Sequence, residues 1–436
     1  MSLETIIYVV TGFLVIALPT LYVINEKRNS AKAAKTLETS TLAGLDQPVS
    51  LHPVIDPDLC IGSGSCTKAC PEQGILQLIN GKAALVNPVR CIGHGQCQAA
   101  CPVDAITLVF GTEKRGVDIP HIKGNFETNV SGIFIAGELG GMGLIRNAVS
   151  QGRQAVESVA GQVKNEKSGE ALDLLIVGAG PAGISASLQA KKEGLRYVTV
   201  DQEDLGGTIF TYPRQKLVMV QPMELPLHGP VKLREVEKEP LLELLTSVVE
   251  KHQLNIQVGE KVNDIKKEGN NYRVTTSKGE YETRKVLLAI GRRGTPRKIG
   301  CPGEKCEKVT YRLLDPHKYH QKKILVVGGG DSAIEAAVAL SNQPGNTVHL
   351  SYRGENIFRI KEGNRERVER AVEDGKVTLL LNSNVTKIEP DKVYIDQQGT
   401  AITLANDQIF VMIGGVLPTE FLQSVGIEFE RKFGQA

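Results

Sequence analysis

The sequence predicts an α/β protein with two Rossmann-like dinucleotide-binding domains, a small α+β domain rich in cysteine and one N-terminal apolar helix. Residues 173–186 and 324–333 each carry an apolar strand run, closely spaced glycines and the start of a helix. Six of the eight cysteines lie between Cys60 and Cys101 in two matching clusters. With 436 residues, the chain is long enough for two or three domains that each bury a core.

The composition limits the partners and the compartment. The net charge is +2 and no long basic run occurs, so the sequence does not predict a nucleic-acid partner. Cysteines gathered in repeated clusters indicate metal sites in a reducing compartment rather than a secreted disulfide framework.

The N-terminal apolar run predicts a membrane anchor. Residues 5–24 carry no charge and are long enough to cross about 30 Å of hydrocarbon as a helix. A cleaved signal peptide and a buried core helix are the alternatives, but only Glu4 precedes the run and the run has no polar face. The basic residues that follow it are Lys27, Arg28, Lys32 and Lys35. The sequence therefore predicts a transmembrane helix at 1–25, a linker at 26–54 and a single-pass protein of the cell inner membrane with cytoplasmic domains.

The two cysteine clusters form an internal repeat. Cys60, Cys66 and Cys70 precede Pro71 with the same spacing as Cys91, Cys97 and Cys101 before Pro102. Residues 55–110 resemble a bacterial two-cluster ferredoxin, whose runs read C-x2-C-x2-C-x3-C-P. The resemblance implies one iron–sulfur cluster on Cys60, Cys66 and Cys101, and another on Cys91, Cys97 and Cys70.

Each run lacks its second cysteine. Ser63 and His94 stand in that place, so each centre is one thiolate short. Three outcomes stay open: a three-iron cluster (3Fe-4S), a four-iron cluster (4Fe-4S) with Ser63 or His94 as a ligand, or a four-iron cluster with an open iron. An imidazole ligand would raise the cluster's reduction potential. Zinc bound by three cysteines and one histidine is the alternative.

The first glycine-rich unit predicts a dinucleotide site. Gly178, Gly180 and Gly183 follow an apolar strand and open a helix, which lets a pyrophosphate approach the backbone at the helix N-terminus. A second apolar run ends at Asp201, whose carboxylate would accept the ribose hydroxyls of an adenosine. A purely structural glycine turn is the alternative.

From Asp173 onward the chain resembles the thioredoxin-reductase-like flavoproteins, within them the bacillithiol-disulfide-reductase-like branch. The resemblance rests on the first glycine motif, on Gly206, Gly207 and Thr208, which in these proteins pass the flavin ring, and on the strand that ends at Gly291. It implies an FAD-binding domain at residues 170–293 and suggests a homodimer.

The second glycine-rich unit predicts a nicotinamide-nucleotide domain at residues 294–413. Gly328, Gly330 and Ala333 occupy its turn. The strand after the helix ends near Arg353 and Arg359 rather than at a carboxylate. Arginine can pair with a 2′-phosphate, so the sequence favours NADPH over NADH. For Arg353, ordinary surface charge is the alternative.

One piece of the flavin domain stands in an unusual place. Members of the resembled family continue after the second unit into a strand and an Ala-Gly-Asp turn, but this chain ends at Ala436. Gly137 and Glu138 follow such a strand upstream, before a helix. We therefore expect a circular permutation, with residues 111–165 as the displaced segment and residues 414–436 returning to the FAD domain. A simple linker is the alternative.

The resembled thioredoxin reductases carry a Cys-x-x-Cys dithiol before the second glycine motif, but residues 309–315 contain no cysteine. Cys301 and Cys306 fall in a turn and are interpreted as incidental. The predicted function is an FAD- and iron–sulfur-dependent NAD(P)H oxidoreductase, with no catalytic side chain, that passes electrons to or from a membrane redox partner, a quinone- or cytochrome-bearing subunit. The alternatives are a disulfide reductase using Cys301 and Cys306, or a non-catalytic flavin-fold subunit of a membrane complex.

Overall fold

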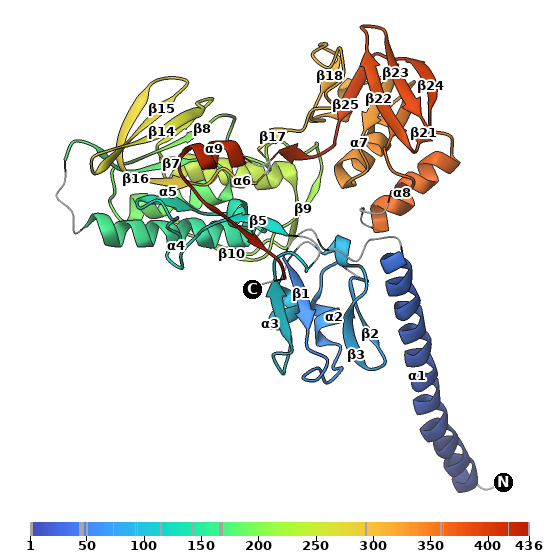
Figure 1. The fold of residues 1–436 in the computed structure, drawn as a ribbon. Coiled ribbons are helices and arrows are strands. Elements are labelled where there is room, and N and C mark those ends of the chain that lie inside the picture. The colour runs from blue at the N-terminus through green and yellow to red at the C-terminus, as the bar shows by residue number, and fades with distance from the viewer. Residues whose placement is uncertain are drawn as a thin grey trace. The chain divides into compact units, whose positions relative to one another are not determined.

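The structure is a computed structural model of the chain. It describes residues 3–42, 48, 51–72, 74–91, 93, 95–113, 116–141, 143–164, 169–292, 294–357, 360, 362–416 and 418–434. The chain divides into two compact units (Figure 1). The first unit is Met1–Asp118 with Arg431–Ala436, and the second is Ile119–Glu430.

The first unit begins with one long helix, α1 (Leu3–Leu42). Its second half packs on the cysteine-rich domain, where Ala33 is fully buried and the Ser30 hydroxyl accepts a hydrogen bond from the Asn80 N–H at 2.9 Å. The linker predicted from residue 26 is therefore helical as far as Leu42. Its lysines, alanines and leucines are good helix formers, and packing adds to that preference.

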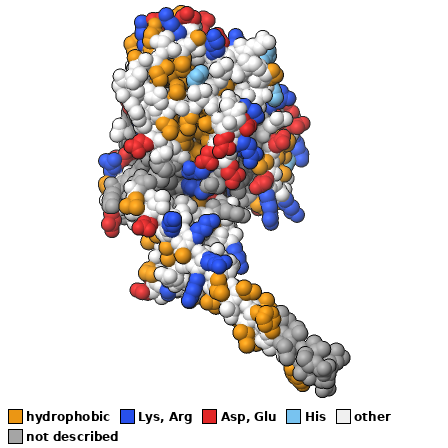
Figure 2. All heavy atoms as spheres, turned by 90° about the vertical axis from the view of Figure 1, so that its right-hand side faces the viewer, with side chains coloured by type: hydrophobic (Ala, Val, Ile, Leu, Met, Phe, Trp, Pro, Cys, Tyr) orange, Lys and Arg blue, Asp and Glu red, His pale blue; other side chains and the backbone are white. Residues whose placement is uncertain are grey.

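The first half of α1 exposes apolar side chains, among them Phe13, Ile16 and Leu21 (Figure 2). Among the described residues, which leave out the side chains of 3–6, 9, 10 and 14, no helix is long and apolar enough to cross a membrane. The predictions of a transmembrane helix at 1–25 and of a single-pass inner-membrane location are wrong on this finding. The apolar run continues without a break into a charged half of the same helix, with Pro19 inside it.

The cysteine-rich domain is built from two similar halves. Its elements are β1 (His52–Ile55), α2 (Ser65–Ala69), β2 (Leu76–Ile79), β3 (Lys82–Leu85), α3 (Gln96–Ala99) and β4 (Ile106–Val109). β1 pairs antiparallel with β4, and β2 with β3. Leu76, Ala105 and Ile106 form its core together with Cys60, Cys66 and Cys97. The cysteines therefore point inward rather than to the surface.

The flavin half of the second unit is organised around one mixed sheet. Its elements are β6 (Ile133–Ile135), α4 (Ile145–Val163), β7 (Leu172–Val177), α5 (Pro181–Lys192), β8 (Tyr197–Asp201), β9 (Leu217–Met219), β10 (Met223–Leu225), β11 (Gly229–Val231), β12 (Glu235–Glu237), α6 (Lys238–Lys251), β13 (Ile256–Val258), β14 (Val262–Glu268), β15 (Asn271–Thr276) and β16 (Glu280–Leu288). The strand order is β13-β8-β7-β16-β15-β14. β9 pairs with β12 and β10 with β11 outside this sheet.

The upstream segment lies in this sheet. β6 pairs parallel with β16, with Phe134 opposite Leu287, on the edge of β16 that faces away from β7. α4 lies beside α5 (Figure 1), and a Cβ at Gly152 would stand 2.1 Å from the Ala182 carbonyl oxygen. Glycine is required at that contact because any side chain would collide with the neighbouring helix backbone. The segment therefore packs into the same apolar core as β7 and β16.

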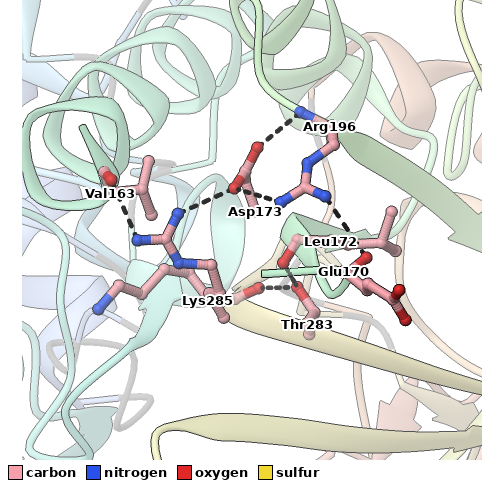
Figure 3. Close-up of polar contacts among 8 residues, drawn as sticks. Val163, Glu170, Leu172, Asp173, Arg196, Thr283 and Lys285 are labelled. Atoms are coloured by element: carbon pink, nitrogen blue, oxygen red, sulfur yellow. Dashed lines mark hydrogen bonds and ion pairs between the residues drawn. The ribbon is translucent and has the colours of Figure 1, made fainter. Parts of the chain in front are cut away.

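The C-terminal end of α4 is fastened at the amino edge of the sheet (Figure 3). The Arg284 guanidinium donates to the Val163 carbonyl at 3.0 Å and to the Asp173 carboxylate at 2.9 Å. Asp173 also accepts the Arg196 backbone N–H at 2.9 Å and contacts its side chain at 3.4 Å. Arg284 joins α4, β7 and β16 because its fork of donors reaches several acceptors at once.

The nucleotide half has a five-stranded parallel sheet in the order β18-β25-β19-β20-β21. Its elements are β17 (Thr295–Pro296), β18 (Val309–Thr310), β19 (Lys323–Val327), α7 (Asp331–Ser341), β20 (Thr347–Ser351), α8 (Glu362–Glu373), β21 (Val377–Leu380), β22 (Ser383–Ile388), β23 (Lys392–Gln397), β24 (Thr400–Ala405), β25 (Gln408–Val411) and β26 (Gly415–Val416). β22, β23 and β24 form a separate antiparallel sheet, and β17 pairs with β26.

The chain then returns to the flavin half through α9 (Thr419–Ser424). Leu422 and Ile427 are buried in the same core as Ile135 and Leu175. Asn129 holds both sides of this return, donating to the Gly426 carbonyl at 2.9 Å and accepting the Glu428 N–H at 3.0 Å. The last strand, β27 (Phe429–Lys432), pairs with β5 (Val117–Pro120).

Candidate functional site

The first cysteine trio surrounds one pocket. Cys60, Cys66 and Cys101 line it together with Ser63. Cys60 and Cys66 are 8% and 6% exposed, whereas Ser63 is exposed at the mouth. Three soft thiolates around one such space fit an iron–sulfur cluster better than a hard cation.

The electrostatics separate the six thiols into two trios. Burial raises the pKa of Cys66, and Cys60 and Cys101 raise it further. Burial likewise raises the pKa of Cys97 to about 11, with Cys91 and Cys70 adding to the effect. These are the two groups implied by the resemblance. A bound metal cation stabilises the thiolate form and so lowers the pKa that burial has raised.

The fourth position differs between the trios. His94 lies outside the described residues, so only Ser63 is placed beside its trio. Among the described residues, no three histidine, cysteine, aspartate or glutamate side chains are arranged to hold a single metal ion.

Glycines shape both cysteine loops. Gly62 and Gly64 have φ of 71° and 68°, and the matching Gly93 and Gly95 have 79° and 73°. A Cβ at Gly62 would stand 2.0 Å from the Gly81 carbonyl oxygen. Such left-handed turns aim backbone N–H groups inward. Backbone N–H groups already point at sulfur, among them Ala83 N–H at Cys60 (3.4 Å) and Ala105 N–H at Cys101 (3.3 Å).

The first glycine motif forms a crowded turn with one approachable face. A Cβ at Gly178 would stand 2.5 Å from the Ala289 oxygen, and one at Gly183 would stand 1.8 Å from the Gly178 oxygen. By contrast, the nearest atom to a Cβ at Gly180 is the Gly207 Cα, at 3.9 Å. Gly180 therefore begins α5 with a backbone that another group can approach closely.

The other predicted flavin residues gather around this turn. The Asp201 carboxylate accepts the Ala179 N–H at 2.6 Å, and the Gly206 N–H donates to the Ala179 oxygen at 3.0 Å. Gly207 contacts Gly180. Burial raises the pKa of Asp201, while N–H groups of Ala179 and Glu203 oppose that rise. Asp201 retains lone pairs for ribose hydroxyls.

The upstream turn reaches the same place. A Cβ at Gly137 (φ 87°) would stand 3.1 Å from the Ala182 Cβ, directly after β6. The carboxyl ends of the parallel strands β6, β7 and β16 meet at one sheet edge, where ligands bind in such folds. Glu138 is exposed and lies beside Gly143. Sequence reasoning missed Gln151, which lies one helical turn before Ala155. The Oε1 atom of Gln151 accepts the Gly137 N–H at 2.8 Å.

The second glycine turn is also close-packed. A Cβ at Gly328 would stand 2.3 Å from the Met412 oxygen, while nothing lies within 4 Å of one at Gly330. Ala333 is fully buried. The Tyr352 ring lies against Gly329, where a Cβ would stand 2.3 Å from it. Sequence reasoning assigned Tyr352 no role, because its position just after β20 does not show which residues its ring contacts.

The two predicted arginines differ in what the structure describes. Arg353 is exposed just after β20, and no hydrogen bond or ion pair joins its side chain to another described residue. Arg359 lies outside the described residues.

Cys301 and Cys306 are free, half-buried thiols beside the β22–β24 core. Burial raises the pKa of Cys301, and Glu304 raises it further. A raised thiol pKa lowers the thiolate fraction that attacks disulfides. The Glu304 carboxylate also accepts the Tyr311 hydroxyl at 2.9 Å, and burial with this contact raises the pKa of Tyr311 to about 12.

Known proteins resemble both the second unit and the cysteine-rich domain of this chain. Residues 175–435 match the family described as pyridine nucleotide-disulphide oxidoreductase, and residues 52–102 match a 4Fe-4S dicluster domain. The bacilliredoxin reductase Bdr of Bacillus subtilis is 28% identical over 60% of this chain and 82% of its own. A ferredoxin–NADP reductase of Picrophilus torridus is 30% identical over 59% of this chain and 78% of its own.

Among solved structures, the bacillithiol disulfide reductase Bdr (YpdA) of Staphylococcus aureus is 30% identical, with a TM-score of 0.53 over 58% of this chain and 80% of its own. The predicted likeness to thioredoxin-reductase-like flavoproteins and to a dicluster ferredoxin is confirmed at this level. The chain is an oxidoreductase that belongs to the pyridine nucleotide-disulphide oxidoreductase family and carries a 4Fe-4S dicluster domain.

Proposed function

We propose that this enzyme couples the oxidation or reduction of NADP(H) to single-electron transfer at iron–sulfur clusters, with FAD between them. The observation that carries the proposal is the pocket of Cys60, Cys66 and Cys101 in the same chain as two glycine turns that can each receive a dinucleotide. Residues 309–315 hold no dithiol, which supports the clusters as the acceptor.

The flavin-half residues fit an FAD. The open Gly180 backbone and the N-terminus of α5 suit a pyrophosphate, and Asp201 suits the adenosine ribose. The Gly137 turn, with Glu138, is suited to the rest of the cofactor. Gly206 donates to the Ala179 carbonyl and Gly207 lies beside Gly180, so both adjoin this turn. Bound FAD supplies the exchange between two-electron and one-electron chemistry.

We infer that NADPH is preferred over NADH. Arg353 follows β20 with no ion partner among the described residues, which leaves its guanidinium available to a 2′-phosphate. The names of several relatives, ferredoxin–NADP reductases, agree with this preference.

We infer that Ser63 leaves the first cluster with an exposed fourth position. Soft thiolates hold iron–sulfur clusters far better than a serine hydroxyl does, and Ser63 stands at the solvent mouth of the pocket. Ser63 would therefore leave a bound cluster without a fourth thiolate on its solvent side, which would favour loss of iron there. His94 would be the counterpart in the second cluster.

We also infer that residues 111–165 are the displaced last piece of the flavin domain. The pairing of β6 with β16 and the close packing of α4 on α5 support this circular permutation. A redox protein that gives or takes single electrons is the proposed partner, and the proposed homodimer is testable by light scattering.

The test is an EPR spectrum of anaerobically purified protein, before and after NADPH is added. New reduced-cluster signals after NADPH are expected. If flavin absorbance bleaches while the clusters stay silent, the proposed connection between flavin and clusters is wrong.

The second candidate is a disulfide reductase that uses Cys301 and Cys306, which the names of the Bdr relatives favour. The C301S/C306S double variant separates the two. Loss of NADPH-dependent disulfide reduction would support this candidate, while unchanged cluster reduction would support the first.

A further inference from the structure

Among the residues that the structure describes, three ion pairs join the flavin half to the nucleotide half of the second unit. Arg312 forks onto Glu203 with both terminal nitrogens, at 2.6 and 2.8 Å. Arg214 reaches Asp315 at 3.7 Å, and its backbone N–H donates to the Leu314 carbonyl at 2.8 Å.

The third pair sits on the helix that begins at the second glycine turn. Lys216 contacts the Glu335 carboxylate of α7 at 2.8 Å. Glu335 is held from behind by Asn364 of α8, which is 5% exposed and donates to it at 3.2 Å. Two segments of the flavin half therefore hold two segments of the nucleotide half.

The Arg312–Glu203 pair is the strongest of the three in geometry. A bidentate guanidinium–carboxylate pair fixes orientation as well as distance. The Glu203 end of the pair is anchored through its backbone: the Glu203 N–H donates to the Asp201 carboxylate at 2.8 Å, and the Gly259 N–H donates to the Glu203 carbonyl at 2.9 Å. The pair therefore reaches directly to the proposed FAD-ribose ligand.

These pairs contribute more to position than to stability. The Arg312 and Glu203 side chains are 41% and 29% exposed, and Arg312 and Asp315 line a pocket that is open to solvent. Exposed ion pairs contribute little to folding and weaken as salt rises. The orientation they set between two nucleotide-binding halves is, by contrast, a large kinetic factor, because small misplacements of reacting groups slow a transfer strongly.

We propose that Arg312 and Glu203, supported by Arg214–Asp315 and Lys216–Glu335, are positioning residues that hold the nucleotide half against the flavin half in the orientation used for hydride transfer. The segment that contains Arg312 and Asp315 then keeps the two halves at a fixed relative orientation. The proposal rests on the proposed use of NADPH and FAD.

The test compares flavin reduction by NADPH in anaerobic stopped-flow experiments. In R312A and in E203A, the limiting rate is expected to fall about tenfold to a hundredfold. The NADPH concentration for half-maximal rate and the dithionite reduction of flavin should stay unchanged. In the charge-exchanged E203R/R312E variant, the rate should return to within about threefold of wild type, because the pair is restored. R273A is the matched control, since it removes an exposed pair with Glu268 that lies within the flavin half.

A second readout does not depend on turnover. Hydrogen exchange of the Arg214 amide, which donates to Leu314, should be about tenfold faster in R312A and unchanged in R273A. Wild-type rates in R312A and E203A, equal exchange at Arg214, or an exchanged variant as slow as the single ones would overturn the proposal. If wild-type flavin is not reduced by NADPH, the proposed function fails, and the Arg214 exchange still decides whether Arg312 holds the two halves.

Discussion

Replacing Arg284 by methionine is expected to loosen α4 from the flavin sheet. The Arg284 side chain is 7% exposed, and two of the hydrogen bonds that it donates join Val163 at the end of α4 to Asp173 at the start of β7. Methionine keeps the apolar stem of the side chain and removes the charge. The segment from β6 to α4 therefore loses its polar attachment at the end opposite the proposed FAD site.

The size of the loss follows from what Asp173 retains. Breaking a buried ion pair costs about 3–5 kcal/mol when the remaining charge has no partner. Asp173 is 13% exposed and keeps the Arg196 N–H at 2.9 Å and its guanidinium at 3.4 Å. A hydrogen bond to a charged group contributes about 1.5–3 kcal/mol. We therefore expect R284M to lower the free energy of unfolding by about 2–3 kcal/mol at pH 7.

The loss should depend on pH. Burial raises the pKa of Asp173, but hydrogen bonds from Arg196 and Arg284 outweigh it, so the pKa is lowered overall. A lowered carboxyl pKa adds stability that is present above the unfolded pKa of about 3.9 and lost as pH falls through the folded pKa. Without Arg284 the lowering weakens, so the difference between R284M and wild type should be largest near neutral pH and shrink below about pH 4.

Urea unfolding followed by circular dichroism, at several pH values, measures this difference. R273M is the control: Arg273 is 51% exposed and pairs with Glu268 at the surface, so its loss should stay within about 0.5 kcal/mol. Stability of R284M equal to that of R273M at neutral pH, or a deficit as large at about pH 2.5 as at pH 8, would refute this account.

Further outcomes are expected at the cofactor sites. S63C should add a fourth thiolate to the first trio and make its cluster resist loss of iron to ferricyanide. The three-iron EPR signal should therefore be weaker in S63C than in wild type, and S65C should not have this effect. R353E should lower the ratio of NADPH to NADH use about tenfold or more in steady-state assays, and an unchanged ratio would contradict the assignment. C301S/C306S should leave NADPH-dependent cluster reduction within about twofold of wild type, since neither thiol belongs to the proposed route.

The cysteine repeat and both glycine turns can be predicted from local sequence. The spacing of the cysteines and of both glycine turns is local, because each depends on backbone conformations within a dozen residues. Gly178, Gly183 and Gly328 therefore lie in crowded turns, where the motif places them. The strand and turn around Gly137 predict a sheet element from local sequence, and β6 pairs with β16.

The contact partners of each motif depend on the tertiary structure. Ser63 lies at the mouth of a three-cysteine pocket, the Tyr352 ring lies on Gly329, and Arg312 pairs with Glu203. The distance between these residues along the chain does not predict that they are in contact. The N-terminal run shows the same limit, since residues 5–24 predicted a membrane span from local hydropathy, and they lie in a 40-residue helix whose second half packs on the cysteine-rich domain. Local sequence fixes backbone preference and side-chain chemistry, whereas contact partners depend on how distant segments pack.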